Sequence, residues 1–279
     1  MDFAWTPTPA SGAPLDAPQK APSAPVAAGV STAPSILILT PVYSGVPLDF
    51  LNMALGIVVG GIQRGVSVGF RGEQSSNVLE ARNALANLFL SSPYSHAFWI
   101  DADMSIPPEA LFRMLGCGVD YVAACGAVRR RASNPRPAIA PMPLCTVDPS
   151  QPVVNGMIET PGAQVSCALI HRRVFERLIA SGEAPKVGRR CHNGTAIVVA
   201  EAHDFFSMLT VAVPGETNPR LLGEDHSFCV RCQRAGIVQR VLVDVDVEHA
   251  GETMNLAEDL ARYRQHVSPA APAQAQACT

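Results

Sequence analysis

Residues 97–103 read Ala97-Phe98-Trp99-Ile100-Asp101-Ala102-Asp103, and this stretch decides the fold class. Four apolar residues run without interruption up to Asp101, which predicts a short buried strand. Met104-Ser105-Ile106-Pro107 then leads into a helix predicted over residues 107–115, with proline in its first turn. Two acidic side chains one residue apart at a strand end cannot both point into the sheet, so we expect them to lie outside it.

The same alternation of strand and helix extends on both sides of this stretch. Asn77 and Glu80 have the spacing of a capping box, which predicts the start of a helix. The elements of this half are predicted as strands over 35–40, 66–70, 97–100 and 121–125, and helices over 47–62, 77–89 and 107–115. This order predicts an α/β fold with a Rossmann-like, mainly parallel central sheet flanked by helices and joined by right-handed crossovers.

Ligands of such sheets bind beyond the carboxyl ends of the strands. Two polar clusters follow predicted strands in this half, Thr40-Pro41-Val42-Tyr43 and Asp101-Ala102-Asp103. We therefore expect both clusters to face one crevice.

The second half is less regular. It is rich in proline and arginine over 129–165, and residues 181–220 receive no firm assignment. A strand end running into a helix is predicted over 168–179, a helix over 224–235, a strand over 238–247 and a helix over 255–266. Residues 1–34 and 268–279 are dominated by Pro, Ala, Ser, Thr and Gln, a composition typical of flexible segments. The expected organisation is an arm (1–34), a folded domain (35–267, divided at 128/129 into a nucleotide-binding half and a smaller acceptor half) and a tail (268–279).

Composition narrows the classes of function. The chain has 279 residues with 48% hydrophobic and 16% charged residues, and its formal net charge is −3, so it has no global basic field that would bind nucleic acid. Eight cysteines without framework spacing and no basic, apolar leader at the N-terminus favour a cytoplasmic protein with reduced thiols. The longest apolar stretch, near 53–62, is too short to span a bilayer, so no membrane anchor is expected.

Asp101 and Asp103 are candidate ligands of a divalent cation. Hard carboxylate oxygens suit Mg²⁺ or Mn²⁺, and phosphate groups of a substrate would complete the coordination sphere. An alternative stays open at this point, because an aspartate before a helix is also a common cap.

Glu224-Asp225 within Gly223-Glu224-Asp225-His226-Ser227-Phe228-Cys229, and His249 after an alternating Val-Asp strand, add to this pattern. Residues 36–255 resemble the nucleotide-diphospho-sugar glycosyltransferases of the GT-A fold, of which soluble members also occur in phages. Besides these two motifs, the resemblance is carried by Leu39-Thr40-Pro41-Val42-Tyr43, Ala81-Arg82-Asn83, Phe98 to Met104, Cys167 to Phe175 and Glu248 to Gly251. The order and spacing of the motifs carry this resemblance; no single motif does.

The resemblance implies a metal-dependent transfer of sugar from a nucleotide-diphospho-sugar, with a UDP-sugar as the expected donor, to an acceptor hydroxyl. Asp101 and Asp103 would hold Mn²⁺ or Mg²⁺ on the diphosphate, with His249 as a further metal ligand. Asp225, with Glu224 as second choice, would be the general base of an inverting reaction. Without the resemblance, the acidic pair is explained by the helix dipole and His249 as an ordinary strand-end histidine.

Contacts to the donor are expected from Thr40, Pro41 and Tyr43, with Tyr43 stacking on the base. Arg82 falls at the margin of the apolar face of its helix, where a guanidinium needs an anionic partner. That partner is either the diphosphate of the donor or Asp101, and in the second case the ion pair only shapes the site.

Several alternatives remain. Arg129-Arg130-Arg131 is either a solvated loop or a contact to a phosphorylated acceptor or to DNA with hydroxymethylated bases. Cys229 and Cys232 could bind zinc with Cys191, His192 or His203, although packing beside Phe228 is favoured. Rival functions are a non-catalytic sugar-nucleotide-binding module and a sugar-1-phosphate nucleotidyltransferase, the latter disfavoured because Thr40 to Gly45 contains one glycine.

Overall fold

The computed structural model describes residues 33–127, 145–192, 197–212, 215, 217–249 and 252–266. The predictions for residues 1–32, for Arg129-Arg130-Arg131 and for the tail over 268–279 lie outside these residues. The described part is a mixed α/β fold, and none of its helices is long and apolar enough to cross a membrane.

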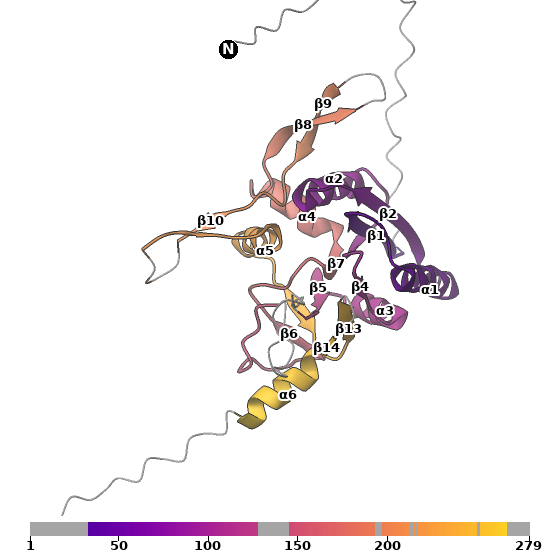
Figure 1. Ribbon diagram of the computed structural model, residues 1–279, viewed down its shortest axis with the longest axis vertical. Helices are drawn as coiled ribbons and strands as arrows, with labels where there is room; N and C mark the ends of the chain where they lie inside the picture. The colour runs from indigo at the N-terminus through magenta and orange to yellow at the C-terminus, as the bar shows by residue number, and fades with distance from the viewer. Residues whose placement is uncertain are drawn as a thin grey trace, which may run out of the picture.

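A seven-stranded sheet forms the centre of the fold (Figure 1). Its strands, in spatial order, are β2 (Ser67–Gln74), β1 (Ser35–Val42), β3 (His96–Ile100), β7 (Cys167–His171), β5 (Tyr121–Ala124), β12 (Arg240–Leu242) and β6 (Met157–Glu159). β1 pairs in parallel with β2 and β3, and β5 pairs in parallel with β12. β7 is antiparallel between β3 and β5, and β6 is antiparallel at the edge. The sheet is therefore largely parallel, as predicted, and both halves of the chain contribute strands to it.

Six helices pack on this sheet: α1 (Leu48–Arg64), α2 (Val78–Leu90), α3 (Pro108–Gly116), α4 (Arg172–Ala180), α5 (Glu224–Arg234) and α6 (Leu256–His266). Alternate residues of β1 enter two separate cores, as the period of a strand requires. Leu37 and Leu39 join the core with α2, α4, α5 and α6, whereas Ile36 and Ile38 join the core with α1 and α3. α1 ends at Gly65, whose φ of 66° closes the helix in the left-handed region.

Four shorter pairings complete the described structure. β4 (Met104–Ser105), β13 (Asp246–His249) and β14 (Glu252–Asn255) form a small sheet, while β8 (Lys186–His192) with β9 (Ile197–His203) and β10 (Thr210–Val211) with β11 (Arg220–Leu221) form hairpins. The hairpin β8–β9 projects beyond α2 and α4, and β10–β11 lies beyond α5 (Figure 1).

Three local predictions were wrong in detail. The single strand over 238–247 is divided, because β12 completes the central sheet and β13 turns away to pair with β4. The first strand continues past Thr40 to Val42, and Pro41 is accommodated opposite Glu73. Asn77 caps α2 by accepting from the Leu79 amide, but its own amide donates to Ser75 Oγ rather than to Glu80, so the capping box does not form.

Candidate active site: carboxylates around a buried arginine

The guanidinium of Arg82 is buried among three carboxylates. Its side chain is 2% exposed, and Nη2 lies 3.1 and 3.2 Å from the two oxygens of Asp101. Nη1 donates to Asp225, and Nε lies 3.9 Å from Glu224 Oε1. These contacts join α2, the end of β3 and the first turn of α5. Of the two partners expected for Arg82, the internal one is present.

The local structure explains why these groups meet. Asp101 immediately follows β3; its amide donates to the Ser166 carbonyl, and its own carbonyl accepts from the Met104 amide, which fixes the turn after the strand. Glu224 and Asp225 occupy the first turn of α5, where the positive end of the helix dipole favours carboxylates. The aspartate motif and the acidic pair are thus about 120 residues apart in sequence but share one cation.

Burial sets the electrostatics of this cluster. Loss of solvent, opposed by Arg82 and reinforced by Asp225, Asp103 and Glu224, raises the pKa of Asp101 to about 6. Loss of solvent and the neighbouring Glu224 likewise raise the pKa of Asp225 against the influence of Arg82. One guanidinium therefore does not neutralise the site, because it contacts three carboxylates (Asp101, Glu224 and Asp225) and Asp103 adds a fourth beside Asp101.

His249 lies on the other side of the aspartate motif, because β13 pairs with β4 and sets His249 opposite Met104. Its Nε2 is 3.4 Å from Asp103 Oδ2, and its Nδ1 is 2.6 Å from the Ala127 carbonyl oxygen, to which it donates. The hydrogen bond with Asp103 is the largest influence on the pKa of His249 and raises it. The pairing of β13 with β4 therefore brings His249 next to Asp103.

The three predicted metal ligands do not form a closed cage. Asp103 pairs with His249, whereas Asp101 faces Arg82. Within the described part of the chain, no group of three or more His, Cys, Asp and Glu side chains is close enough to hold an ion by itself. Metal binding at this position stays a prediction.

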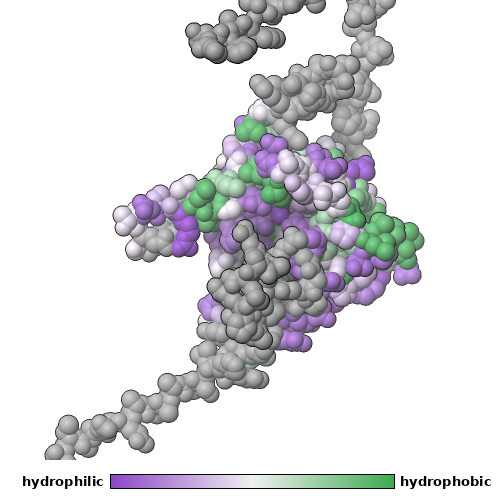
Figure 2. Space-filling model, in the orientation of Figure 1, coloured by the Kyte–Doolittle hydropathy of each residue, from purple (hydrophilic) through white to green (hydrophobic). Residues whose placement is uncertain are grey.

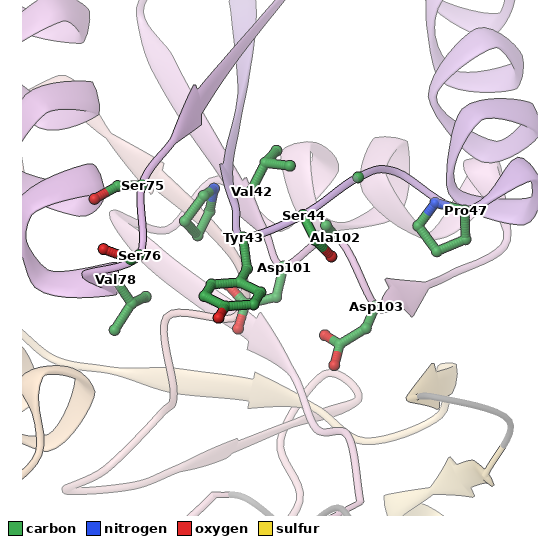
Figure 3. A pocket seen from close by; sticks show the side chains of 12 residues that line it. Val42, Tyr43, Ser44, Pro47, Ser75, Ser76, Val78, Asp101, Ala102 and Asp103 are labelled. Atoms are coloured by element: carbon green, nitrogen blue, oxygen red, sulfur yellow. The ribbon is translucent and has the colours of Figure 1, made fainter.

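A pocket of about 490 Å³ opens beside the aspartate motif (Figure 3). It is lined by Pro41, Val42, Tyr43, Ser44, Gly45, Pro47, Ser75, Ser76, Val78, Asp101, Ala102 and Asp103. Figure 3 shows the Ser75–Ser76 segment on one side and Pro47 on the other, with Tyr43, Asp101 and Asp103 between them. Residues from the end of β1 and from the aspartate motif after β3 therefore face one cavity, although Thr40 does not.

Not every predicted donor contact lines this pocket. Tyr43 is 75% exposed and free to contact a ligand, but Thr40 is completely buried. Thr40 and Arg82 are absent from the pocket lining, so within the described structure they support the site from behind it. Ser75 and Ser76 also line the pocket but were not predicted from the sequence. They follow β2, so a second strand predicted to end at Gln74 would have put them at a strand end, where ligands are expected.

Gln164 is a further buried polar residue that the sequence did not single out. Its Nε2 donates to the Ala124 carbonyl at 2.7 Å, and its Oε1 has no hydrogen-bond partner among the described residues. With Asp225, His226 and Cys229 it lines a cavity of about 50 Å³, enough for a water molecule or a hydroxyl group. Nothing in the local sequence distinguishes this glutamine from a surface residue of a loop.

Cys229 and Cys232 are buried on the inner face of α5. Cys229 Sγ donates to the Ala163 carbonyl, and Cys232 lies in the same core as Phe228. Burial raises the pKa of both thiols. The side chains of Cys191 and His192 lie outside the described structure, while His203 Nδ1 is engaged by the Ala184 carbonyl.

No protein family matches the chain, and no curated protein matches it in sequence. Among solved structures, the chain is similar to the crystal structure of A197 from STIV, with a TM-score of 0.42 and 12% sequence identity over 80% of this chain and 91% of that one.

Proposed function

We propose that this protein is a metal-dependent glycosyltransferase that moves a sugar from a nucleotide-diphospho-sugar to an acceptor hydroxyl. One observation carries the proposal. Four carboxylates and His249 gather at the carboxyl ends of the strands, beside a pocket large enough for a nucleotide portion of the donor. The acidic groups that the resemblance to GT-A enzymes assigns to metal binding and catalysis therefore lie close to one another, which supports the proposal.

The charge of the site supports a divalent cation. Arg82 supplies one positive charge to three carboxylates, those of Asp101, Glu224 and Asp225, while Asp103 lies against His249. Neighbouring carboxylates that are not neutralised repel one another. Asp103 and His249 have the chemistry to hold Mn²⁺ or Mg²⁺, with Asp101 adjacent and the diphosphate completing the set. Because His249 Nδ1 is fixed by the Ala127 carbonyl, its Nε2 is oriented toward the place where such an ion would lie. When bound, the ion would offset negative charge on the departing nucleoside diphosphate.

Other residues of the chain would bind the nucleotide and transfer the proton. Tyr43, Pro41, Ser75 and Ser76 are available to hold the nucleotide in the pocket. A carboxylate of the acidic pair would take the proton of the acceptor hydroxyl. At the same time the hydroxyl oxygen would bond to the anomeric carbon of the sugar, and the bond from that carbon to the diphosphate would break. Burial raises the pKa of Asp225, which makes it a better base than an exposed aspartate.

Asp225 and Glu224 differ in their contact with Arg82. Asp225 forms a direct hydrogen bond with Arg82, whereas Glu224 is held only by the longer contact from Nε. We assign Asp225 as the base and Arg82 as the residue that positions it, with Glu224 as the second carboxylate of the pair.

A second candidate is a non-catalytic module that binds the same donor. It is favoured by the observation that Arg82 engages both Asp101 and Asp225, so that the two carboxylates form an internal ion cluster. The two candidates share the pocket and the metal and differ only in whether a bond is broken.

Donor hydrolysis tests the proposal without knowledge of the acceptor. The full chain would be incubated with a panel of sugar nucleotides and Mn²⁺, and released nucleoside diphosphate would be measured. We expect turnover of one donor that disappears with EDTA and in Asp103→Ala. Metal-dependent binding of a donor by calorimetry, without turnover in the presence of any acceptor tested, would instead establish the binding module. Absence of both would overturn the proposal.

A further inference from the structure

The side-chain amide of Gln164 is buried with one of its two polar ends unpaired. Its Nε2 donates to the Ala124 carbonyl, whereas its Oε1 has no hydrogen-bond partner among the described residues. The amide cannot be turned over to pair Oε1, because two carbonyl oxygens would then face each other. A buried acceptor without a partner costs free energy, so a donor hydrogen for Oε1 has to come from a bound water or a ligand.

Gln239 shows how a glutamine with both ends paired is held in the same part of the fold. Its Oε1 accepts from the Ala163 amide at 3.3 Å, and its Nε2 donates to the Cys229 carbonyl at 2.8 Å. Gln239 is 2% exposed and Gln164 is 5% exposed, so the two are equally buried. Gln239 therefore joins two backbone segments, whereas Gln164 lines a cavity and keeps an acceptor free.

The cavity that Gln164 lines together with Asp225 presents hydrogen-bond acceptors to a ligand. Arg82 donates to Asp225 Oδ1, and the described structure contains no further hydrogen bond to this carboxylate. Cys229 also lines the cavity, but its Sγ donates to the Ala163 carbonyl. A ligand that satisfies both free acceptors must therefore donate one hydrogen bond to Asp225 and another to Gln164.

The charges beside the cavity select a neutral ligand. Asp225 would repel a phosphate or a carboxylate, and neither group would bring a hydrogen for Gln164 Oε1. A primary ammonium could donate to both acceptors, but it would lie next to the guanidinium of Arg82, which already pairs with Asp225. Hydroxyl groups donate hydrogen bonds without carrying a charge, so they fit this cavity best.

The size of the cavity suits two hydroxyl groups. Its volume is about 50 Å³, whereas one water molecule needs about 10–15 Å³. A whole sugar ring does not fit, so the ring of an acceptor would stay at the mouth. Exposed His226 lines the cavity, which therefore reaches the surface at the start of α5, and Figure 2 shows hydrophilic surface next to α5.

We propose that this cavity is the acceptor subsite and that it selects an acceptor with hydroxyl groups on two adjacent carbons, as in sugars and other polyols. The inference rests on the proposed function, in which Asp225 is the base. The attacking hydroxyl has a single hydrogen, which it gives to Asp225. The hydroxyl on the neighbouring carbon donates to Gln164 Oε1 and keeps its hydrogen throughout. Gln164 therefore binds the acceptor and takes no part in the bond changes.

An acceptor with a lone hydroxyl is a poorer substrate for such a subsite. The hydroxymethyl group of a modified base in DNA could donate to Asp225 but would leave Gln164 Oε1 unpaired. Because an unpaired buried acceptor is costly, we expect a lone hydroxyl to react about 10- to 100-fold less efficiently than one of an adjacent pair.

Competition between two alcohols of equal size tests the subsite. The full chain would be incubated with Mn²⁺, the donor that the hydrolysis assay identifies, and equal concentrations of ethane-1,2-diol and propan-1-ol, in which a methyl group replaces one hydroxyl. The ratio of the two glycosides, measured by mass spectrometry, gives the ratio of kcat/KM and does not depend on the amount of folded protein. We expect the wild type to favour the diol by about 10- to 100-fold.

Gln164→Met keeps the length of the side chain and removes Oε1, so its ratio should fall to the statistical preference from the second hydroxyl of the diol. Its donor affinity should be unchanged, because Gln164 does not line the donor pocket. Gln233→Met is the matched control: Gln233 is an exposed glutamine of α5 that donates to the Pro161 carbonyl, and its variant should keep the wild-type ratio.

The outcomes separate this inference from the proposed function. Donor hydrolysis without a diol glycoside, or with the same ratio in the wild type and in Gln164→Met, would overturn the subsite and leave the transferase standing. In that case a buried water satisfies Oε1. Absence of any donor turnover would instead overturn the transferase, and the acceptor subsite with it.

Discussion

Arg82 Nη2 lies within 3.2 Å of both oxygens of Asp101, although Arg82 is on α2 and Asp101 ends β3. Because the same guanidinium also donates to Asp225 on α5, one buried side chain connects the aspartate motif to the acidic pair. The stability of the site and the ionisation of its carboxylates therefore depend on Arg82.

Arg82→Ala should destabilise the protein, by about 3 kcal/mol, because it leaves three partly buried carboxylates without their cation. Arg82→Lys should recover only part of this, since an ammonium cannot contact three carboxylates in the same way as a guanidinium. Urea unfolding measures both. Arg113→Ala, which removes an exposed ion pair with Asp244, is the control and should cost less than about 1 kcal/mol. An equal, small effect at both positions would contradict the central role of Arg82.

His249→Gln and Asp103→Asn should each weaken metal-dependent donor binding by about 10- to 100-fold while leaving the fold intact, because both residues are at the edge of the site. Calorimetry measures this binding in the presence of Mn²⁺, with the intact sugar nucleotide that the hydrolysis assay identifies as the donor. Asp244→Asn, a carboxylate on the exposed ion pair with Arg113, should bind as the wild type does. Wild-type affinity in both site variants would remove His249 and Asp103 from the metal site.

Asp225→Asn should lower transfer by about 10²- to 10⁴-fold and spare donor binding, because it removes a base and keeps the shape of the side chain. Glu224→Gln should have a smaller effect, since Glu224 is farther from Arg82. Initial rates with the preferred donor, and its binding measured separately, distinguish the two. A larger loss in Glu224→Gln would transfer the role of base to Glu224.

Tyr43→Ala should weaken donor binding by about 3- to 10-fold through loss of aromatic contact area, whereas Tyr43→Phe should bind nearly as the wild type does. Tyr43 is largely exposed, so neither variant should change the melting temperature. Equal binding by all three proteins would show that the base of the donor lies elsewhere in the pocket.

Protonation of His96 should reduce stability as the pH falls. Burial, with His171 and Arg173 nearby, lowers the pKa of His96 to about 4, below its usual value of 6.5. Between pH 6.5 and 4 the unfolded chain binds a proton at His96 that the folded chain does not. The free energy of unfolding is therefore not reduced by His96 above about pH 6.5, and it falls as the pH falls toward 4. His96→Gln should show a shallower decline of the melting temperature over this range. Parallel curves for the two proteins would assign the acid sensitivity to other groups.

Much of this fold is readable from local sequence. The apolar runs at 36–39 and 97–100 became buried strands because nothing but burial accommodates such stretches, and Pro and Gly mark the ends of α1 and α3. The helix of Glu224 and the strand-to-helix passage through His171 were predicted for the same reason. These features depend on periodicity within about 15 residues.

The pairing of distant segments could not be read in this way. Residues 238–247 were predicted as one strand, but Arg240–Leu242 pairs with β5, whereas Asp246–His249 pairs with β14 and β4. Only those partners divide the predicted strand. The antiparallel insertion of β7 between β3 and β5 is likewise a choice of neighbour that local propensity does not express.

Local sequence shows which groups are available: the aspartate motif at a strand end, the acidic pair at a helix start, His249 after a strand, and a helical segment without charge from Phe50 to Gln63. The tertiary structure alone decided their partners. It put Arg82 among Asp101, Glu224 and Asp225, set His249 against Asp103, and buried Thr40. The physical reason is that hydrophobic patterning specifies which face of an element is buried, whereas the neighbour across that face follows from the packing of the whole chain.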